Sequence, residues 1–180
     1  PLLTVANEFF DALPVRQFVR TEAGWREMMV AHDGDRLVRV AGNEPCEALV
    51  PTPLHHAPTG SVHESCPDAH AIVAALATRI AAQGGLLLVI DYGYVGPALG
   101  DTLQAVRGHG FADPLANAGE VDLTAHVDFS ALAAAAPQLH IAGPVGQGDW
   151  LTRLGIDART AALAARNLER AADLQAQRDR

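Results

Sequence analysis

The amino-acid sequence predicts an α/β fold in which parallel strands are joined through a helix and an antiparallel β ribbon is inserted. Residues 86–90 are an unbroken apolar segment, and residues 2–6 are short, apolar and in part β-branched, as strands buried on both faces are. A segment beginning at Pro67 carries apolar residues at helical spacing, whereas residues 15–40 alternate with period two. A helix placed between two buried strands indicates a crossover unit, and the alternating segment is typical of an antiparallel ribbon.

The first predicted strand, residues 2–6, ends at Asn7-Glu8. Residues 9–13 then allow about one helical turn before Pro14, because proline cannot continue a helix.

The ribbon of residues 15–40 has turn signals at Ala23-Gly24 and at Asp33-Gly34, and the second of these is a strong hairpin signal. Residues 41–64 are rich in proline and glycine and show no period, so we predict a loop there.

The central helix is predicted to begin at Pro67, because proline suits the first helical position and Asp68 opposes the positive end of the helix dipole. Gly84-Gly85 should end it, and the strand of residues 86–90 follows directly. Because the two strands connect through a helix, they are expected to be parallel neighbours.

The second half of the chain has weaker patterns. Asp128 is a candidate N-cap for the helix that follows it. The predicted elements are a strand at 122–128, a helix at 129–136, a strand at 140–145, a short helix at 149–154 and a last helix at about 158–177.

Composition limits the class of protein and its partners. The 180 residues suit a single domain, and the 13 basic residues, all arginine, face 21 acidic ones for a net charge of −8. Neither nucleic acid nor an anionic membrane is therefore expected as the main partner, and no apolar run predicts membrane insertion. The two cysteines fit a reducing cytoplasm rather than a disulfide framework.

Polar side chains follow both predicted buried strands. Asn7 and Glu8, with Asp11 close behind, end the first strand, and Asp91 and Tyr92 end the second. Since ligands of open α/β sheets bind at the carboxyl edge, these groups predict a small-molecule site. The alternative is that Asn7 and Asp91 only cap their strands.

The sequence motifs of several common ligand-binding and catalytic sites are missing. The sequence has neither a phosphate-binding glycine-lysine loop nor a dinucleotide fingerprint, and no Gly-x-Ser-x-Gly elbow. No metal site is predicted, because the histidines and cysteines lack the paired spacing of zinc ligands. These residues are Cys46, His55, His56, His63, Cys66 and His70.

A further polar patch lies between residues 104 and 129. Arg107 could pair with Asp122 or Asp128 and only stabilise this substructure, or Arg107 and His126 could contact a substrate. The residues alone leave both interpretations open.

Four blocks of the sequence resemble the MidA-type methyltransferases, which are S-adenosylmethionine-dependent class I (Rossmann-like) proteins. They occur in the family's order and together are highly specific. The blocks are Ala6-Asn7-Glu8-Phe9-Phe10-Asp11-Ala12-Leu13-Pro14, Ile90-Asp91-Tyr92-Gly93, Thr102-Leu103-Gln104-Ala105-Val106-Arg107 and Asp122-Leu123-Thr124-Ala125-His126-Val127-Asp128-Phe129.

The resemblance covers only the carboxyl-side portion of the family. The glycine-rich cofactor motif with its first three strands, and a terminal strand, have no counterpart here. The chain, which opens at Pro1 without methionine, is therefore expected to be a single partial domain over residues 1–180, with residues 15–62 as the inserted ribbon and loop. Alone it is expected to be inactive.

By this resemblance, S-adenosyl-L-methionine is the cofactor, Asn7 and Glu8 bind it, and Glu8, Asn7 and Asp11 carry the catalysis. Asp91, Tyr92, His126 and Arg107 would then contact the substrate. The implied substrate is an arginine of a protein, in the family's mitochondrial members a subunit of respiratory complex I. A bacterial protein of this kind would be cytoplasmic, its eukaryotic relatives mitochondrial, and a homodimer fits either. The alternatives are a non-catalytic assembly scaffold and a small-molecule methyltransferase.

Overall fold

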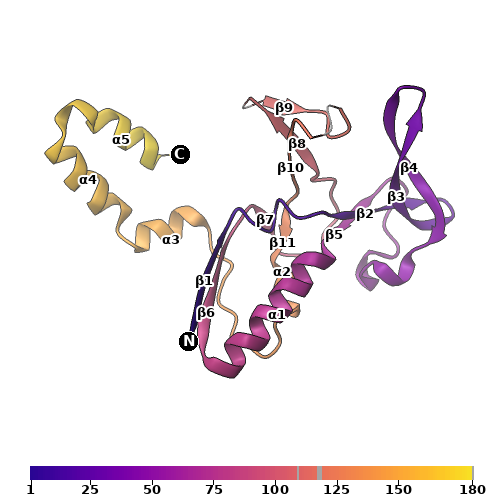
Figure 1. The fold of residues 1–180 in the computed structure, drawn as a ribbon, viewed down its shortest axis with the longest axis horizontal. Helices are drawn as coiled ribbons and strands as arrows, with labels where there is room; N and C mark the ends of the chain where they lie inside the picture. Colours follow the sequence, from indigo (N-terminus) through magenta and orange to yellow (C-terminus); the bar gives the residue numbers. More distant parts are fainter. Residues whose placement is uncertain (109, 117–118, 180) are drawn as a thin grey trace. The chain divides into compact units, whose positions relative to one another are not determined.

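The computed structural model describes residues 1–108, 110–116 and 119–179 of the chain. It has mixed α and β structure, as predicted (Figure 1). By its internal contacts the chain divides into two units, Pro1–Ile141 and Ala142–Arg180. Among the described residues, no helix combines the length and the apolar character that crossing a membrane would require.

A parallel strand pair organises the first unit. β1 (Leu2–Asn7) lies beside β6 (Gly85–Ile90), with Leu2 opposite Gly85 and Asn7 opposite Ile90. The helix that connects them, α1 (Pro67–Gln83), runs alongside the pair (Figure 1). The predicted crossover and the parallel pairing are confirmed.

One hydrophobic core joins α1 to the strands. Ala69, Val73 and Ala77 on one face of α1 are buried, and Phe10 and Leu132 pack in the same cluster. The helix begins at Pro67 as predicted and ends at Gly84, whose φ of +76° a residue with a side chain rarely adopts.

The alternating segment forms an antiparallel sheet in the order β4-β3-β2-β5. Its hairpins turn at the two predicted places, between Thr21 and Gly24 and between Asp33 and Arg36. Phe18, Trp25, Cys46 and Val50 form its core. The strands are β2 (Arg16–Thr21), β3 (Gly24–Asp33), β4 (Arg36–Pro45) and β5 (Val62–Ser65).

The prediction of an unbroken loop over residues 41–64 is wrong. β4 continues to Pro45, two single-turn helices occupy Glu47–Leu49 and Thr52–Leu54, and β5 returns to pair with β2. The buried His63 and Glu64 of β5 are polar, so the strand carries no hydrophobic period that the sequence could reveal.

The segment predicted as one strand at 122–128 forms two separate strands. β10 (Asp122–Thr124) pairs antiparallel with β8 (Gln104–Arg107), whereas β11 (Val127–Asp128) pairs parallel with β7 (Gly93–Tyr94). Asp128 caps α2 (Phe129–Ala134) as predicted, since its side chain accepts from the N–H groups of Ser130 and Ala131. The remaining strand is β9 (Gly110–Ala112).

The strand predicted at 140–145 is not formed. Gly143 has a φ of +97°, and Pro144 has no N–H to donate to a neighbouring strand.

The second unit is helical. The short helix is confirmed as α3, but the single last helix is wrong, because the backbone of Asn167 (φ −145°, ψ 78°) is not helical and interrupts it. The elements are α3 (Gln147–Arg153), α4 (Ile156–Arg166), a single turn at Leu168–Arg170 and α5 (Ala171–Arg178).

Candidate active site

The carboxyl ends of β1 and β6 meet at one edge of the parallel pair. Asn7 lies opposite Ile90, and the backbone N–H of Glu8 donates to the carbonyl of Ile90 over 2.9 Å. Asn7 and Glu8 therefore share this edge with Asp91 and Tyr92, the next residues after β6. The predicted adjacency is confirmed, whereas the roles of these residues stay predictions.

Asp91 shapes the turn that follows β1. Its Oδ2 accepts from the backbone N–H groups of Phe9 at 3.3 Å and Phe10 at 2.9 Å, and its Oδ1 accepts from that of Tyr92 at 3.1 Å. Residues 9–13, where about one helical turn is expected, form a single hydrogen-bonded turn rather than a helix, and the N–H of Leu13 donates to the carbonyl of Phe10 over 3.3 Å. Asp91 thus does cap this region, in agreement with the alternative interpretation of that residue.

Glu8 has an unusual backbone conformation. Its φ of +47° is the only positive value at a non-glycine residue among those that the structure describes. Such a conformation costs about 1–3 kcal/mol and persists only where its surroundings enforce it. Here the bonds to Ile90 and Asp91 on either side enforce it, and the Glu8 side chain stays exposed.

Asp11 brings a third carboxyl group to this edge. It is only 7% exposed, and its Oδ1 has no hydrogen-bond partner among the described residues. Burial raises the pKa of Asp11, and the nearby carboxylates of Asp91 and Glu8 raise it further. An acidic site of this kind would be stabilised by a cation.

Arg107 and His126 do not join this cluster. Arg107 pairs with Glu120 at 2.9 Å, and both side chains are more than half exposed, so the predicted pairing with Asp122 or Asp128 is wrong. Asp128 is instead occupied as the cap of α2. The backbone N–H of His126 donates to Thr102 Oγ1 over 2.8 Å, which places His126 at the wall of a nearby cavity.

That cavity has a volume of about 290 Å³ and lies between the antiparallel sheet and α2. Its polar lining includes His63, Glu64, Tyr94 and Asp128. Sequence reasoning identified Asp128 as a helix cap and as a possible partner of Arg107, and it assigned no role to Glu64 or Tyr94. The available signal was the pair His63-Glu64, a histidine beside an acidic residue at the end of the segment predicted as a loop.

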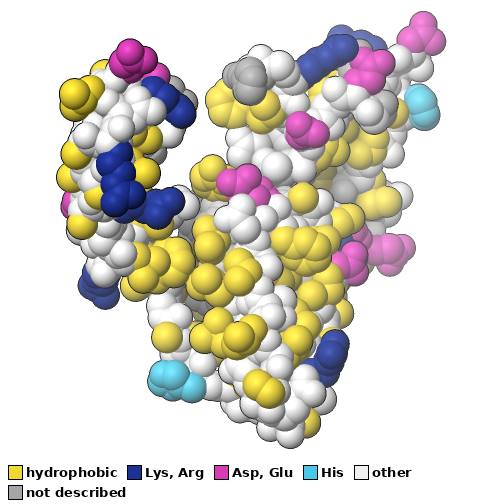
Figure 2. Space-filling view, turned by 60° about the vertical axis from the view of Figure 1, so that its left-hand side comes forward, with side chains coloured by type: hydrophobic (Ala, Val, Ile, Leu, Met, Phe, Trp, Pro, Cys, Tyr) yellow, Lys and Arg dark blue, Asp and Glu magenta, His cyan; other side chains and the backbone are white. Residues whose placement is uncertain are grey.

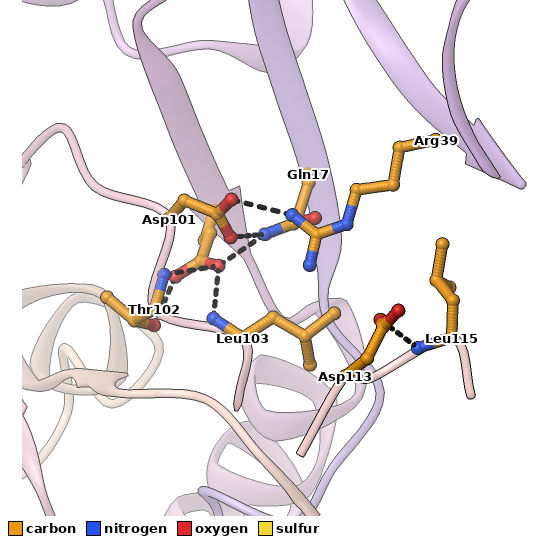
Figure 3. A network of polar contacts seen from close by, with 8 residues as sticks. Gln17, Arg39, Asp101, Thr102, Leu103, Asp113 and Leu115 are labelled. Carbon is orange, nitrogen blue, oxygen red and sulfur yellow. Dashed lines mark hydrogen bonds and ion pairs between the residues drawn. The ribbon is translucent and has the colours of Figure 1, made fainter. Parts of the chain in front are cut away.

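Glu64 is the centre of a buried hydrogen-bond network. Its carboxylate accepts from Gln17 Nε2 at 2.7 Å, from Thr102 through both its N–H and its hydroxyl, and from the N–H of Leu103 at 3.2 Å. In Figure 3, the Gln17 amide and the Arg39 guanidinium lie on the same side of Asp101, which binds both. The network ties residues 101–103 to the antiparallel sheet, and through Thr102 it fixes the backbone of His126.

Within the described residues, no group of three or more histidine, cysteine or acidic side chains could hold a metal ion. Cys46 and Cys66 are both free thiols.

Comparisons with known proteins agree on one family. The model of a family described as S-adenosyl-L-methionine-dependent methyltransferase matches residues 1–145. The protein arginine methyltransferase NDUFAF7 of Danio rerio, which is named as mitochondrial, is 41% identical over 168 residues, covering 91% of this chain and 39% of that protein. Its Homo sapiens counterpart is 39% identical, over 92% of this chain and 38% of that protein.

A solved structure is similar over nearly the whole chain. The crystal structure of a Burkholderia thailandensis protein bound to S-adenosyl-homocysteine matches with a TM-score of 0.79 and 26% identity, covering 96% of this chain and 48% of that one. The present chain spans about two fifths of the length of the curated relatives it matches.

Proposed function

Because the chain belongs to the S-adenosyl-L-methionine-dependent methyltransferase family, we propose that it carries part of the active site of a methyltransferase acting on protein arginine. One observation carries the choice of substrate. Glu8, Asp11 and Asp91 place three interacting carboxyl groups at the carboxyl ends of two neighbouring parallel strands. A guanidinium group remains charged at neutral pH, and paired carboxylates are the groups that bind it best.

The same edge suits the methyl donor. S-adenosyl-L-methionine supplies a methyl group on a positively charged sulfur, and an acidic edge with an exposed amide fits such a cation. Asn7 and Glu8, at the end of β1, are the residues that would hold it.

Glu8 is the main candidate for catalysis. Its exposed carboxylate, held by a constrained backbone, can orient the guanidinium and take the proton that the methylated nitrogen loses. Asp11 is the second candidate, because its buried carboxyl group lies close enough to interact with Glu8. Asp91 is a positioning residue, since its carboxylate holds the backbone of Phe9 and Phe10.

Three further residues are predicted to contact the substrate. Tyr92 is exposed beside Asp91 and would line the acceptor channel, with the sheet of residues 15–40 as its cover. His126 would contact the substrate at the cavity. Arg107 is exposed, so it would contact the substrate only at the protein surface beside β8.

The rest of the methyltransferase domain has a place to pack. Leu3 on β1 is 78% exposed and Leu86 on β6 is 55% exposed, although parallel sheets are normally covered on both faces. Figure 2 shows hydrophobic side chains gathered where β1 and β6 lie. We assign this face to the cofactor-binding half of the domain, so that the present chain is its carboxyl-side part.

The proposed substrate is a protein, in agreement with the names of the relatives. A subunit of respiratory complex I is the specific candidate. A reducing compartment, bacterial cytoplasm or mitochondrion, suits the two free cysteines. A homodimer would be detected by measuring the mass of the full-length protein in solution.

Glu8→Gln in the full-length protein tests the assignment. Formation of S-adenosyl-homocysteine with an arginine-containing peptide should fall about 10²–10³-fold, the usual loss when one stabilising group is removed. Asp122→Asn, which removes an exposed carboxylate of β10, is the control and should keep full activity.

Three outcomes would contradict the proposal. Unchanged transfer in Glu8→Gln would remove Glu8 from its role. No transfer by the wild type would favour an assembly scaffold, and equal turnover of free arginine would favour a small-molecule methyltransferase.

A further inference from the structure

The cavity beside α2 presents hydrogen-bond acceptors to its interior. His63 of β5 is only 4% exposed and lies at the cavity wall. Its Nδ1 is 3.2 Å from the carbonyl oxygen of Ala98. Because a carbonyl oxygen can only accept, Nδ1 carries the proton, and the other ring nitrogen, Nε2, is left as an acceptor in the neutral ring.

The histidine stays neutral in this position. Burial lowers the pKa of His63, while the Ala98 carbonyl and the carboxylates of Asp128 and Glu64 oppose this shift more weakly. No hydrogen bond joins Nε2 to any residue in the described part of the chain. A ligand in the cavity can therefore donate to it.

The cavity is also lined by two acidic side chains, Glu64 and Asp128. Burial raises the pKa of Tyr94 to about 12, and the carboxylates of Asp128 and Glu64 contribute to that rise. The Asp128 Oδ1 accepts three backbone N–H groups, from Gly96, Ser130 and Ala131. Its Oδ2 has no hydrogen bond to the described residues, and no arginine lines the cavity.

The apolar walls and the volume set the size of the ligand. Phe10 and Leu132 also line the cavity, and about 290 Å³ lies at the lower limit for small-ligand pockets. The space suits one long side chain with an aliphatic stem and a donor at its end. Arginine and lysine have this form.

We propose that this cavity binds a basic side chain of the protein substrate, next in sequence to the arginine that is methylated. The inference rests on the proposed function. Phe10 connects the two places, since its N–H is held by Asp91 at the strand ends while the residue lines the cavity. A peptide with its reacting arginine beside Glu8 would thus have a neighbouring side chain within reach of Asp128.

Binding of capped amino acids to the full-length protein tests the proposal without any methyl transfer. N-acetyl-argininamide and N-acetyl-lysinamide are the probes, and N-acetyl-leucinamide is the neutral comparison. Calorimetry should show at least tenfold weaker binding of the leucine probe. Comparing the affinities of the arginine and lysine probes shows which basic side chain the cavity prefers.

Asp128→Asn removes the charge but keeps an oxygen that can cap α2, so basic probes should bind at least tenfold more weakly. Asp122→Asn is the matched control and should leave binding unchanged. Ala131→Leu, which narrows the cavity without changing any charge, should likewise weaken binding of the basic probes at least tenfold.

Equal binding of the leucine probe, or basic probes unaffected by both Asp128→Asn and Ala131→Leu, would overturn the proposal. Should Asp128→Asn fail to fold, Ala131→Leu decides. Probe binding that is lost in Glu8→Gln but kept in Ala131→Leu would place the basic group at the strand ends instead. Since binding and turnover are measured separately, failure here leaves the methyltransferase assignment to its own test.

Discussion

The Asp91 carboxylate accepts a hydrogen bond of 2.9 Å from the backbone N–H of Phe10, which lies 81 residues earlier in the chain. Through this bond the end of β6 fixes the turn after β1, including Glu8 with its φ of +47°. The geometry of the proposed catalytic residue therefore depends on a neighbouring strand rather than on its own local sequence.

Asp91→Ala should both destabilise the protein and disturb the site. Three backbone N–H groups lose their acceptor, and because only that of Phe10 is partly buried, the loss should be about 1 kcal/mol. Urea denaturation measures this change. Asp122→Ala, which removes an exposed carboxylate, should change stability by less than about 0.5 kcal/mol. Equal stability of the two variants would show that the Asp91 bonds do not hold the turn.

Glu64→Gln should also lower the stability of the protein. The carboxylate is 5% exposed and accepts four hydrogen bonds, whereas an amide has one acceptor oxygen and would direct its NH₂ group at other donors. A loss of about 1.5–3 kcal/mol is expected in chemical denaturation.

Glu120→Gln is the matched control for Glu64→Gln. The Glu120 ion pair with Arg107 is largely exposed, so its loss should cost no more than about 1 kcal/mol. A Glu64→Gln protein as stable as this control would contradict the network.

The crossover unit was predictable from sequence because each of its signals is local. Each signal depends on only a few neighbouring residues. The signals are the apolar segments 2–6 and 86–90, Pro67 at the start of the helix and Gly84 at its end. β5 was not predictable, since it is held by long-range pairing to β2 and by polar side chains that the network satisfies. The break at Asn167 has no strong sequence signal either, because asparagine is tolerated inside helices.

The same distinction applies to the candidate site. The edge shared by four of its residues could be deduced because the sequence implied parallel pairing of the two strands. Asn7 ends the first strand and Glu8 follows it, and Asp91 and Tyr92 follow the second. The burial of Asp11 and the cavity beside α2 depend on packing between segments far apart in the chain. Only the fold itself brings those residues together.

Gly85→Ala should weaken the β1–β6 pair. Gly85 has a φ of +149°, and a Cβ atom there would overlap the backbone of Leu2 on the neighbouring strand. The strained conformation alone costs about 1–3 kcal/mol, and separating the strands adds to it. Gly110→Ala is the control, because its Cβ would meet nothing closer than 3.7 Å. Thermal unfolding that is the same in both variants would rule out this close contact.

Asp11→Asn should stabilise the protein while lowering its activity. The folded state raises the pKa of Asp11 above its ordinary value of 3.8, so at neutral pH folding must accommodate a charge that burial and two neighbouring carboxylates disfavour. The amide avoids this charge. A rise in Tm of about 2–4 °C at pH 7 corresponds to a gain of about 1 kcal/mol for a chain of this size.

The pH dependence separates this effect from ordinary repacking. With a raised folded pKa, the folded state binds more protons than the unfolded one, so wild-type stability falls as pH rises from the ordinary Asp range through the folded pKa. The Tm difference between Asp11→Asn and the wild type should therefore be large at pH 7 and shrink as pH falls toward about 4. Because Asp11 is the second candidate for contact with the guanidinium, methyl transfer by the full-length variant should fall while its Tm rises. A variant that is less stable at pH 7 would instead make Asp11 a structural residue whose carboxylate the fold requires.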